Sequence, residues 1–121
     1  MNVNESAWLD GLFACIDAMD SERFVAHLTP EAEFQFGNLP PVRGAAQITA
    51  MVGSFFAGLR GLRHTLLERW ANGDTLVCRG TVTYLRHDGR EVTVPFANIM
   101  RRAGEHASEY RIYADVSPLF A

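Results

Sequence analysis

Three polar side chains of the C-terminal half have the type and setting to do chemistry inside a protein. His64 stands in the run Leu62-x-His64-x-Leu66, an alternation typical of a strand with one apolar face. Histidine is the side chain that gains or loses a proton near neutral pH, so His64 is the candidate general base of a proton-transfer reaction. The simpler interpretation gives its ring a backbone carbonyl as partner and no chemical role.

Arg79 and Asn98 follow on later strand-like segments. Burying a guanidinium without a partner is costly, so Arg79 should pair with a carboxylate. That carboxylate is either Glu68, which we favour, or an acidic group of a ligand. Asparagine is depleted in strands, so Asn98 on an otherwise apolar strand face is a candidate ligand contact.

Three turn signals define the elements that must position these residues. Asn72-Gly73, Asp88-Gly89 and Ala103-Gly104 separate strand-like segments at 62–71, 74–87, 90–102 and 106–115. The chain before residue 60 predicts a helix over 5–19 capped by Asn4, a short helix capped by Asp20, a strand at 33–36 and a helix after Gly44. This order predicts an α+β fold, in which a curved antiparallel sheet packs against three N-terminal helices around an internal small-molecule cavity.

The register of the hairpins predicts which side chains share a face. Two-residue loops would place His64 inside the curve with the following residues: Leu62, Leu66, Trp70, Val77, Arg79, Thr81, Thr83, Val92, Val94, Phe96, Asn98 and Met100. The outer face would then carry Leu67, Leu76, Cys78, Val82, Tyr84, Pro95, Ala97 and Ile99. So apolar an outer face predicts a homodimer through it. A β-bulge would reverse this assignment locally.

Composition narrows the possible partners and location. The 121 residues predict one domain over 1–121, and the net charge of -3 comes without any basic run longer than two residues. Nucleic acid and membrane surfaces are therefore unexpected partners. The N-terminus lacks signal-peptide features, so we expect a cytoplasmic protein whose Cys15 and Cys78 are packing residues. No metal-ligand spacing or phosphate-binding loop is present, and we expect no metal and no cofactor.

Four segments in order along the chain resemble one superfamily. They are the helix end 16–20 (IDAMD), the segment 34–44 (FQFGNLPPVRG), the Asp88-Gly89 turn and the segment 110–115 (YRIYAD). The chain is similar to the SnoaL-like branch of the nuclear transport factor 2-like superfamily. This resemblance implies a cone-shaped sheet around a small-molecule cavity, commonly in a homodimer. It does not imply one chemistry, because the fold hosts isomerases, cyclases, hydrolases, dehydratases and binding modules.

Comparison with the ketosteroid isomerases of this superfamily makes that activity unexpected here. Their general base, an Asp, corresponds to Phe36, and their oxyanion tyrosine falls near Leu12. Their protonated Asp falls within 96–98, which contains no acid. All three catalytic roles are lost.

The limonene-epoxide hydrolases match more residues. Their water-positioning Asn corresponds to Asn38, and their Arg-x-Asp motif corresponds to Arg79-Gly80-Thr81. Their Trp-Arg-Asp motif corresponds to Tyr110-Arg111-Ile112, so the water-activating acid is replaced by Ile112. Asp115 is the nearest remaining acid, as in the polyketide cyclases, but strand parity places it on the other face.

The sequence therefore predicts a pocket protein that binds a small apolar or weakly anionic molecule of unknown identity. The alternative is an enzyme for isomerisation, cyclisation or dehydration, with His64 as base and Arg79 and Asn38 stabilising negative charge. A dimeric interaction module with a filled core is the second alternative. The predicted ligand contacts are Phe36, Asn38, Trp70, Thr81, Phe96, Asn98, Tyr110 and Ile112.

Overall fold

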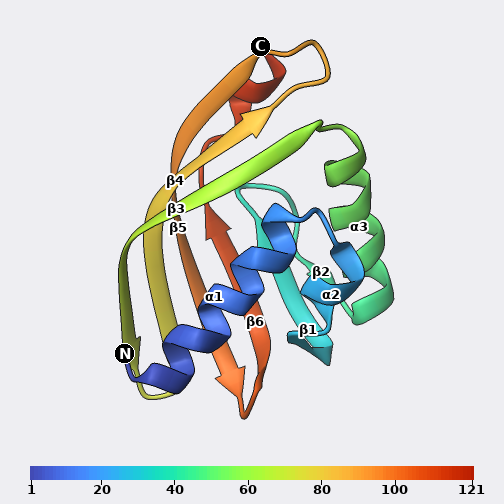
Figure 1. Ribbon diagram of the computed structural model, residues 1–121. Coiled ribbons are helices and arrows are strands. Elements are labelled where there is room, and N and C mark those ends of the chain that lie inside the picture. Colours follow the sequence, from blue (N-terminus) through green and yellow to red (C-terminus); the bar gives the residue numbers. More distant parts are fainter.

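A curled six-stranded sheet and three helices make up the computed structural model, which describes residues 1–121 (Figure 1). The helices are α1 (Val3–Asp17), α2 (Ser21–Val25) and α3 (Ala45–Ala57). The strands lie in the order β2-β1-β6-β5-β4-β3. Their bounds are β1 Leu28–Phe36, β2 Val42–Arg43, β3 Gly61–Asn72, β4 Thr75–Leu85, β5 Glu91–Ala103 and β6 His106–Tyr113, and the 3-10 helix η1 (Ser117–Phe120) follows.

The predicted α+β class is confirmed, with one difference in the sheet. β1 pairs with β6 in parallel, so the sheet is mixed rather than antiparallel throughout. β1 is also longer than the predicted 33–36, because its first residue, Leu28, pairs with Ala107. The register between β1 and β6 shifts between Leu28 and Glu33, and this interval contains Pro30, which cannot donate to a ladder.

The helix starts follow capping chemistry. Asn2, not Asn4, caps α1: its side chain accepts from the Glu5 amide while the Glu5 carboxylate accepts from the Asn2 amide. Asp20 caps α2 as predicted and accepts from the Arg23 amide. α3 begins directly after Gly44 and buries Ile48, Val52 and Phe56. In Figure 1, α1 crosses the sheet diagonally and α3 lies beside β1 and β2.

A bulge in β3 decides which residues face the helices. Leu62 pairs with Tyr84 and His64 with Val82, but beyond Leu67 the register shifts and Trp70 pairs with Val77. A side chain at Gly80 would overlap the carbonyl oxygen of Thr65, so only glycine fits where the bulge brings β3 against β4.

The inner-face prediction for β4 was therefore wrong. The odd-numbered residues of β4, which are Val77, Arg79, Thr81 and Thr83, lie on the outer face, and so does Trp70 of β3. The buried inner residues are those expected outside: Leu76, Cys78, Val82 and Tyr84.

The β4–β5 loop restores the predicted parity for β5. Arg86 donates its amide to the Arg90 carbonyl, so the loop spans three residues and Leu85 pairs with Glu91. Gly89 takes the left-handed φ of 87° that such a loop requires. Because this loop and the bulge offset each other, the predicted inner residues of β5 are confirmed as buried: Val92, Val94, Phe96, Asn98 and Met100.

The hydrophobic core fills the space between the concave sheet face and the helices. Leu9, Leu12 and Ile48 are fully buried there from α1 and α3. None of the helices combines the length and the apolar character needed to cross a bilayer.

Candidate functional site: a cavity inside the curled sheet

A cavity of about 550 Å³ lies between the concave face of the sheet and the helices. Of the 25 residues that line it, 18 are hydrophobic. The phenylalanines of the wall come from β1, α2, α3, β5 and η1: Phe24, Phe34, Phe36, Phe55, Phe56, Phe96 and Phe120. Such a surface favours an apolar molecule, and its few polar groups would fix the orientation of that molecule.

His64 lies in this wall and is paired with Asp17, the last residue of α1. The His64 Nδ1 atom is 2.6 Å from Asp17 Oδ1, and the His64 amide donates to Asp17 Oδ2 at 3.1 Å. Phe13 and Phe96 pack on the imidazole with ring centroids at 4.8 and 5.1 Å. The predicted backbone-carbonyl partner is therefore replaced by a carboxylate that holds both the backbone and the ring of His64.

This pairing sets the chemical capacity of His64. A carboxylate only accepts hydrogen bonds, so Nδ1 carries the hydrogen and the neutral ring presents Nε2 as an acceptor. Nε2 has no hydrogen-bond partner in the protein, and the residue lines the cavity. The arrangement can take a proton from a bound molecule and stabilise the resulting imidazolium through Asp17.

Sequence reasoning missed Asp17, although a local signal pointed to it. An acidic residue in the last turn of a helix is unfavourable against the helix dipole, so another interaction must favour it. Here that interaction is the contact with His64, which is 47 residues away in the sequence.

Asn98 and Tyr110 form a second polar pair in the cavity wall. Asn98 Nδ2 donates to the Tyr110 hydroxyl at 2.8 Å, and both residues are buried. Phe24 and Phe34 pack on the Tyr110 ring at 5.5 and 5.7 Å. Burial raises the pKa of Tyr110 well above its ordinary value, so its hydroxyl stays neutral.

Two more titratable groups on the same face are kept neutral by burial. Desolvation raises the pKa of Cys78 to about 12 and the pKa of Tyr84 to about 12. Tyr84 lines the cavity, whereas Cys78 does not. The polar groups inside the sheet therefore act as hydrogen-bonding groups, and the Cys78 thiol is not poised as a nucleophile.

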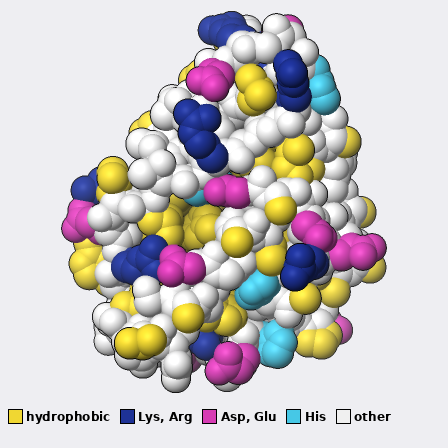
Figure 2. Space-filling view, viewed as in Figure 1, with side chains coloured by type: hydrophobic (Ala, Val, Ile, Leu, Met, Phe, Trp, Pro, Cys, Tyr) yellow, Lys and Arg dark blue, Asp and Glu magenta, His cyan; other side chains and the backbone are white.

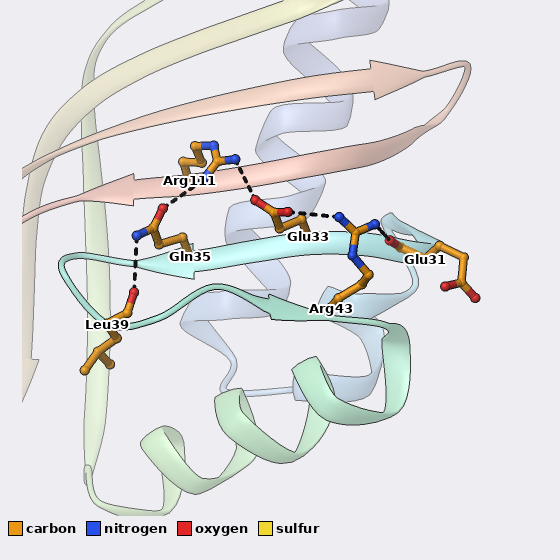
Figure 3. A network of polar contacts seen from close by, with 6 residues as sticks. All are labelled: Glu31, Glu33, Gln35, Leu39, Arg43 and Arg111. Carbon is orange, nitrogen blue, oxygen red and sulfur yellow. Dashed lines mark hydrogen bonds and ion pairs between the residues drawn. The ribbon is translucent and has the colours of Figure 1, made fainter.

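The loop after β1 brings Asn38 to the cavity, together with Gly37 and Leu39. A polar network on the outer side holds this loop (Figure 3). Gln35 donates to the Leu39 carbonyl at 3.2 Å, and Arg111 bridges Gln35 and Glu33 at 2.7 and 2.6 Å. Arg43 completes the network through Glu33 and the Glu31 carbonyl. The network lies outside the cavity and acts on it by fixing the loop.

Of the predicted site residues, seven line the cavity: Phe36, Asn38, His64, Phe96, Asn98, Tyr110 and Ile112. Arg79, Trp70 and Thr81 do not, because the β3 bulge turns them outward. Arg79 donates its Nε to Glu68 Oε1 at 2.6 Å, which is the protein partner that the sequence favoured. Both side chains are about half exposed, at 50% and 46%.

The C-terminal segment also lines the cavity, which the sequence did not indicate. Val116, Ser117 and Phe120 contribute, and Arg86 ties η1 to β4 by donating to the Leu119 carbonyl at 3.1 Å. Asp115 lies at the same rim rather than on the other face, because β6 ends at Tyr113 and strand parity no longer applies. The Ser117 amide donates to Asp115 and lowers the pKa of that carboxyl.

No three His, Cys, Asp or Glu side chains gather in a group that could hold a metal ion. The ionisable groups of the cavity wall are His64, Asp115 and two tyrosines, and neither lysine nor arginine is among them. The chemistry that the wall offers is therefore hydrogen bonding and proton transfer.

Comparisons with known proteins agree with this architecture. An NTF2-like protein of unknown function from Burkholderia pseudomallei K96243 superposes with a TM-score of 0.87 at 16% identity, covering 98% of this chain and 96% of its own. TerC, co-crystallised with polyporic acid, gives 0.83 at 18% identity, covering 97% and 95%. A candidate SnoaL-like polyketide cyclase from Jannaschia sp. CCS1 gives 0.78 at 18% identity, covering 99% and 93%. At these identities the likeness shows the fold alone.

Sequence comparison assigns the family. No curated protein sequence matches the chain. The model of the SnoaL-like domain matches residues 9–110, which is most of the chain. The resemblance read from the sequence is thereby confirmed, and the protein belongs to the SnoaL-like domain family within the NTF2-like superfamily.

Proposed function

We propose that this SnoaL-like domain binds a small, mainly apolar organic molecule in the cavity of its curled sheet. The observation that carries the proposal is the cavity itself, whose volume of about 550 Å³ lies in the range of small-molecule sites. An interaction module with a filled core would not need such a space. The polyporic acid in TerC, a protein of the same fold, adds support.

The wall favours a neutral ligand over an anionic one. Arg79 was the cation that made a weakly anionic ligand plausible, and it lies on the outer face in a pair with Glu68. Figure 2 shows acidic and basic side chains interspersed on the helix side of the molecule, with hydrophobic side chains in recesses between them. No region of one charge sign on this face would attract nucleic acid or a charged membrane.

A plugging variant tests the binding proposal. Ile112 lines the cavity, so Ile112→Trp should fill part of it and weaken binding of the neutral fluorophore N-phenyl-1-naphthylamine at least tenfold. Ile99→Trp is the matched control, because Ile99 faces outward on the neighbouring strand. Fluorescence titration measures both. Equal affinity in the two variants, or no binding to the unmodified protein, would contradict the proposal.

The Asp17–His64 pair favours a second candidate function, proton transfer on the bound molecule. His64 Nε2 would remove a proton from carbon next to a carbonyl group, and Asp17 would stabilise the imidazolium at 2.6 Å. Asn38, at the cavity, would be a donor to the developing enolate oxygen. Isomerisation, cyclisation and dehydration all contain such a step.

Hydrogen–deuterium exchange of 2-tetralone in D₂O, followed by NMR, measures this step without knowledge of the natural substrate. We expect the protein to accelerate the exchange and His64→Ala to lower the catalysed rate by ~10²–10⁴-fold. His106→Ala is the control, since His106 is exposed at the start of β6. A rate unchanged in His64→Ala would leave binding as the function.

We also propose a homodimer through the outer sheet face. The exposed apolar residues there are Leu67, Trp70, Ile99 and Tyr113, from strands β3, β5 and β6. Tyr84 is no longer part of this surface, because it is buried inside. Light scattering should give twice the chain mass of 13.5 kDa, and Ile99→Glu should shift the protein towards the monomer. A monomer mass for the unmodified protein at micromolar concentration would rule the dimer out.

The sequence-based expectation of a cytoplasmic location is kept as part of this proposal. Both cysteines are free, and a reducing compartment would keep them so.

A further inference from the structure

Asn98 carries the one polar atom of the cavity wall that is buried without a partner. The residue is 2% exposed and lines the cavity, and its Oδ1 accepts no hydrogen bond. Its Nδ2 donates one of its two hydrogens to the Tyr110 hydroxyl. A buried acceptor left unpaired is unfavourable, so a donor that reaches Oδ1 would gain more than an exposed hydrogen bond provides.

Tyr110 has an unused hydrogen-bond donor close to the unpaired acceptor of Asn98. Its hydroxyl accepts from Asn98 and makes no other hydrogen bond, so its own hydrogen remains to be donated. Burial raises the pKa of Tyr110 well above its ordinary value, so the hydroxyl keeps that hydrogen. Asn98 Oδ1 therefore lacks a donor, and the neighbouring Tyr110 hydroxyl lacks an acceptor for its hydrogen. A hydroxyl group is the smallest organic group that supplies both.

We propose that the Asn98–Tyr110 pair binds a hydroxyl group of the ligand, which donates to Asn98 Oδ1 and accepts from the Tyr110 hydroxyl. The ligand is then a hydroxylated, otherwise apolar ring compound. This inference rests on the proposed binding function and narrows the class of its ligand. It also makes Asn98 and Tyr110 the residues that set specificity.

The pair and His64 lie at different places in the cavity wall. Val82 pairs with both His64 and Val94, so Asn98 lies four residues along β5 from the row of His64. Four residues of a strand span about 13 Å. A compound of two fused rings bound at the pair therefore occupies only part of the cavity and need not reach His64. The phenylalanines of the wall would contact the faces of those rings.

Three naphthalenes of nearly equal shape test the inference by calorimetric titration at neutral pH. 2-Naphthol donates and accepts, 2-methoxynaphthalene only accepts, and naphthalene does neither. We expect 2-naphthol to bind ~10-fold more tightly than the methoxy compound, because one buried hydrogen bond distinguishes them. Asn98→Leu should reduce this ratio towards one, because it removes the acceptor that only 2-naphthol can use. Tyr110→Phe should keep the ratio and weaken both oxygen-bearing compounds relative to naphthalene, because both accept from the Tyr110 hydroxyl. Both variants should leave the affinity for naphthalene within about twofold.

Thr83→Val is the matched control. The Thr83 and Thr93 hydroxyls bond at 2.8 Å on the outer face, so this variant also removes a buried strand hydroxyl but leaves the cavity intact. Thr83→Val should keep the ~10-fold preference for 2-naphthol over 2-methoxynaphthalene. Should Asn98→Leu fail to fold, the nearly isosteric Tyr110→Phe carries the test: both oxygen-bearing compounds should lose affinity relative to naphthalene, and an unchanged preference over naphthalene would overturn the inference.

The outcomes separate the inference from the proposed function. Naphthol and methoxynaphthalene binding equally well would overturn the inference and leave the binding function standing; this is also the result if a water satisfies the pair. Preference for the methoxy compound would mean that the Asn98 amide donates towards the cavity, and would overturn it too. Absence of binding by all three compounds would contradict both proposals.

Discussion

The two faces of the long β3–β4–β5 sheet use polar residues differently. On the concave face, burial keeps Cys78 and Tyr84 neutral and raises the pKa of each to about 12. On the convex face, charged side chains form half-exposed pairs such as Arg79–Glu68 and Arg63–Glu91. Water solvates charges on the outer side, so they need no strong partner there. Charged side chains on the concave side have close partners on α1, as in Arg69–Asp10 at 2.9 Å and His64–Asp17 at 2.6 Å. The groups of the β3–β5 strands that line the cavity itself and can do chemistry are His64, Asn98 and Tyr84.

One backbone feature decides which residues belong to which face. The extra residue at Leu67 moves Arg79 and Trp70 outward and Cys78 and Tyr84 inward. Gly80 allows the close approach of β3 and β4 at that point. The contrast between the faces thus depends on a single glycine in the middle of a strand.

Replacing Gly80 should therefore have the largest effect on the sheet. In Gly80→Ala the new methyl group would overlap the Thr65 carbonyl oxygen, which is backbone and cannot turn away. We expect a loss of about 3 kcal/mol or more in the free energy of unfolding, since overpacking against rigid atoms is at the upper end of such costs. Urea denaturation followed by circular dichroism measures it.

Gly53→Ala is the control for this variant. Gly53 lies inside α3, and its nearest neighbour is the flexible Ser21 hydroxyl at 3.4 Å. Alanine is the better helix former, so Gly53→Ala should leave stability unchanged or raise it by up to about 1 kcal/mol. If Gly80→Ala were as mild as Gly53→Ala, the bulge would not depend on glycine.

A rise to alkaline pH should have the next largest effect on stability, because Cys78 and Tyr84 on the concave face are buried and ionise there. The pKa of Cys78 rises on folding from 9.0 to about 12, and that of Tyr84 from 10.0 to about 12. In these windows the folded state binds more protons than the unfolded state, so stability is complete below pH 9 and falls as pH rises. Each group should cost about 1.4 kcal/mol per pH unit once the unfolded form is ionised.

The slope of the unfolding free energy against pH shows which buried group causes the loss of stability. Tyr84→Phe removes one buried hydroxyl and should make the decline above pH 10 shallower. Tyr113→Phe, on the exposed outer side of β6, serves as control. Chemical denaturation at a series of pH values compares the two. An identical slope in both variants would mean that burial of Tyr84 does not control its ionisation.

Local sequence patterns were sufficient to predict most helices, strands and turns. They were insufficient to predict which face of the sheet each β4 residue lies on. The stripe of α3, the Asp20 cap and the glycine turns predicted their elements, because each acts within a few residues. A bulge shifts every later residue by one, so the inside and outside of β4 were exchanged. Gly80 in the middle of a strand was the available signal, since glycine there often marks a bulge.

The features of the site also fall into two groups, those that a local sequence pattern predicted and those that depend on tertiary contacts. His64 and Asn98 could be predicted because a polar residue interrupts an apolar strand face. The pairing of His64 with Asp17 joins a strand to the end of a helix 47 residues earlier, and no local pattern encodes that distance. The rim formed by the C-terminal segment is likewise a tertiary arrangement that follows only from the closed fold.

The smallest expected effect is that of Arg79→Leu, and it tests the comparison most directly. A buried Arg79 would leave Glu68 uncompensated on removal, at a cost of ~3–5 kcal/mol. Arg79 is 50% exposed and Glu68 46%, so solvent screens the pair and its loss should cost less than about 1 kcal/mol. Binding of N-phenyl-1-naphthylamine should not change, because neither residue lines the cavity. A large loss of stability or of binding would place Arg79 on the concave face after all, and the division of charge between the two faces would then fail at the residue that defines it.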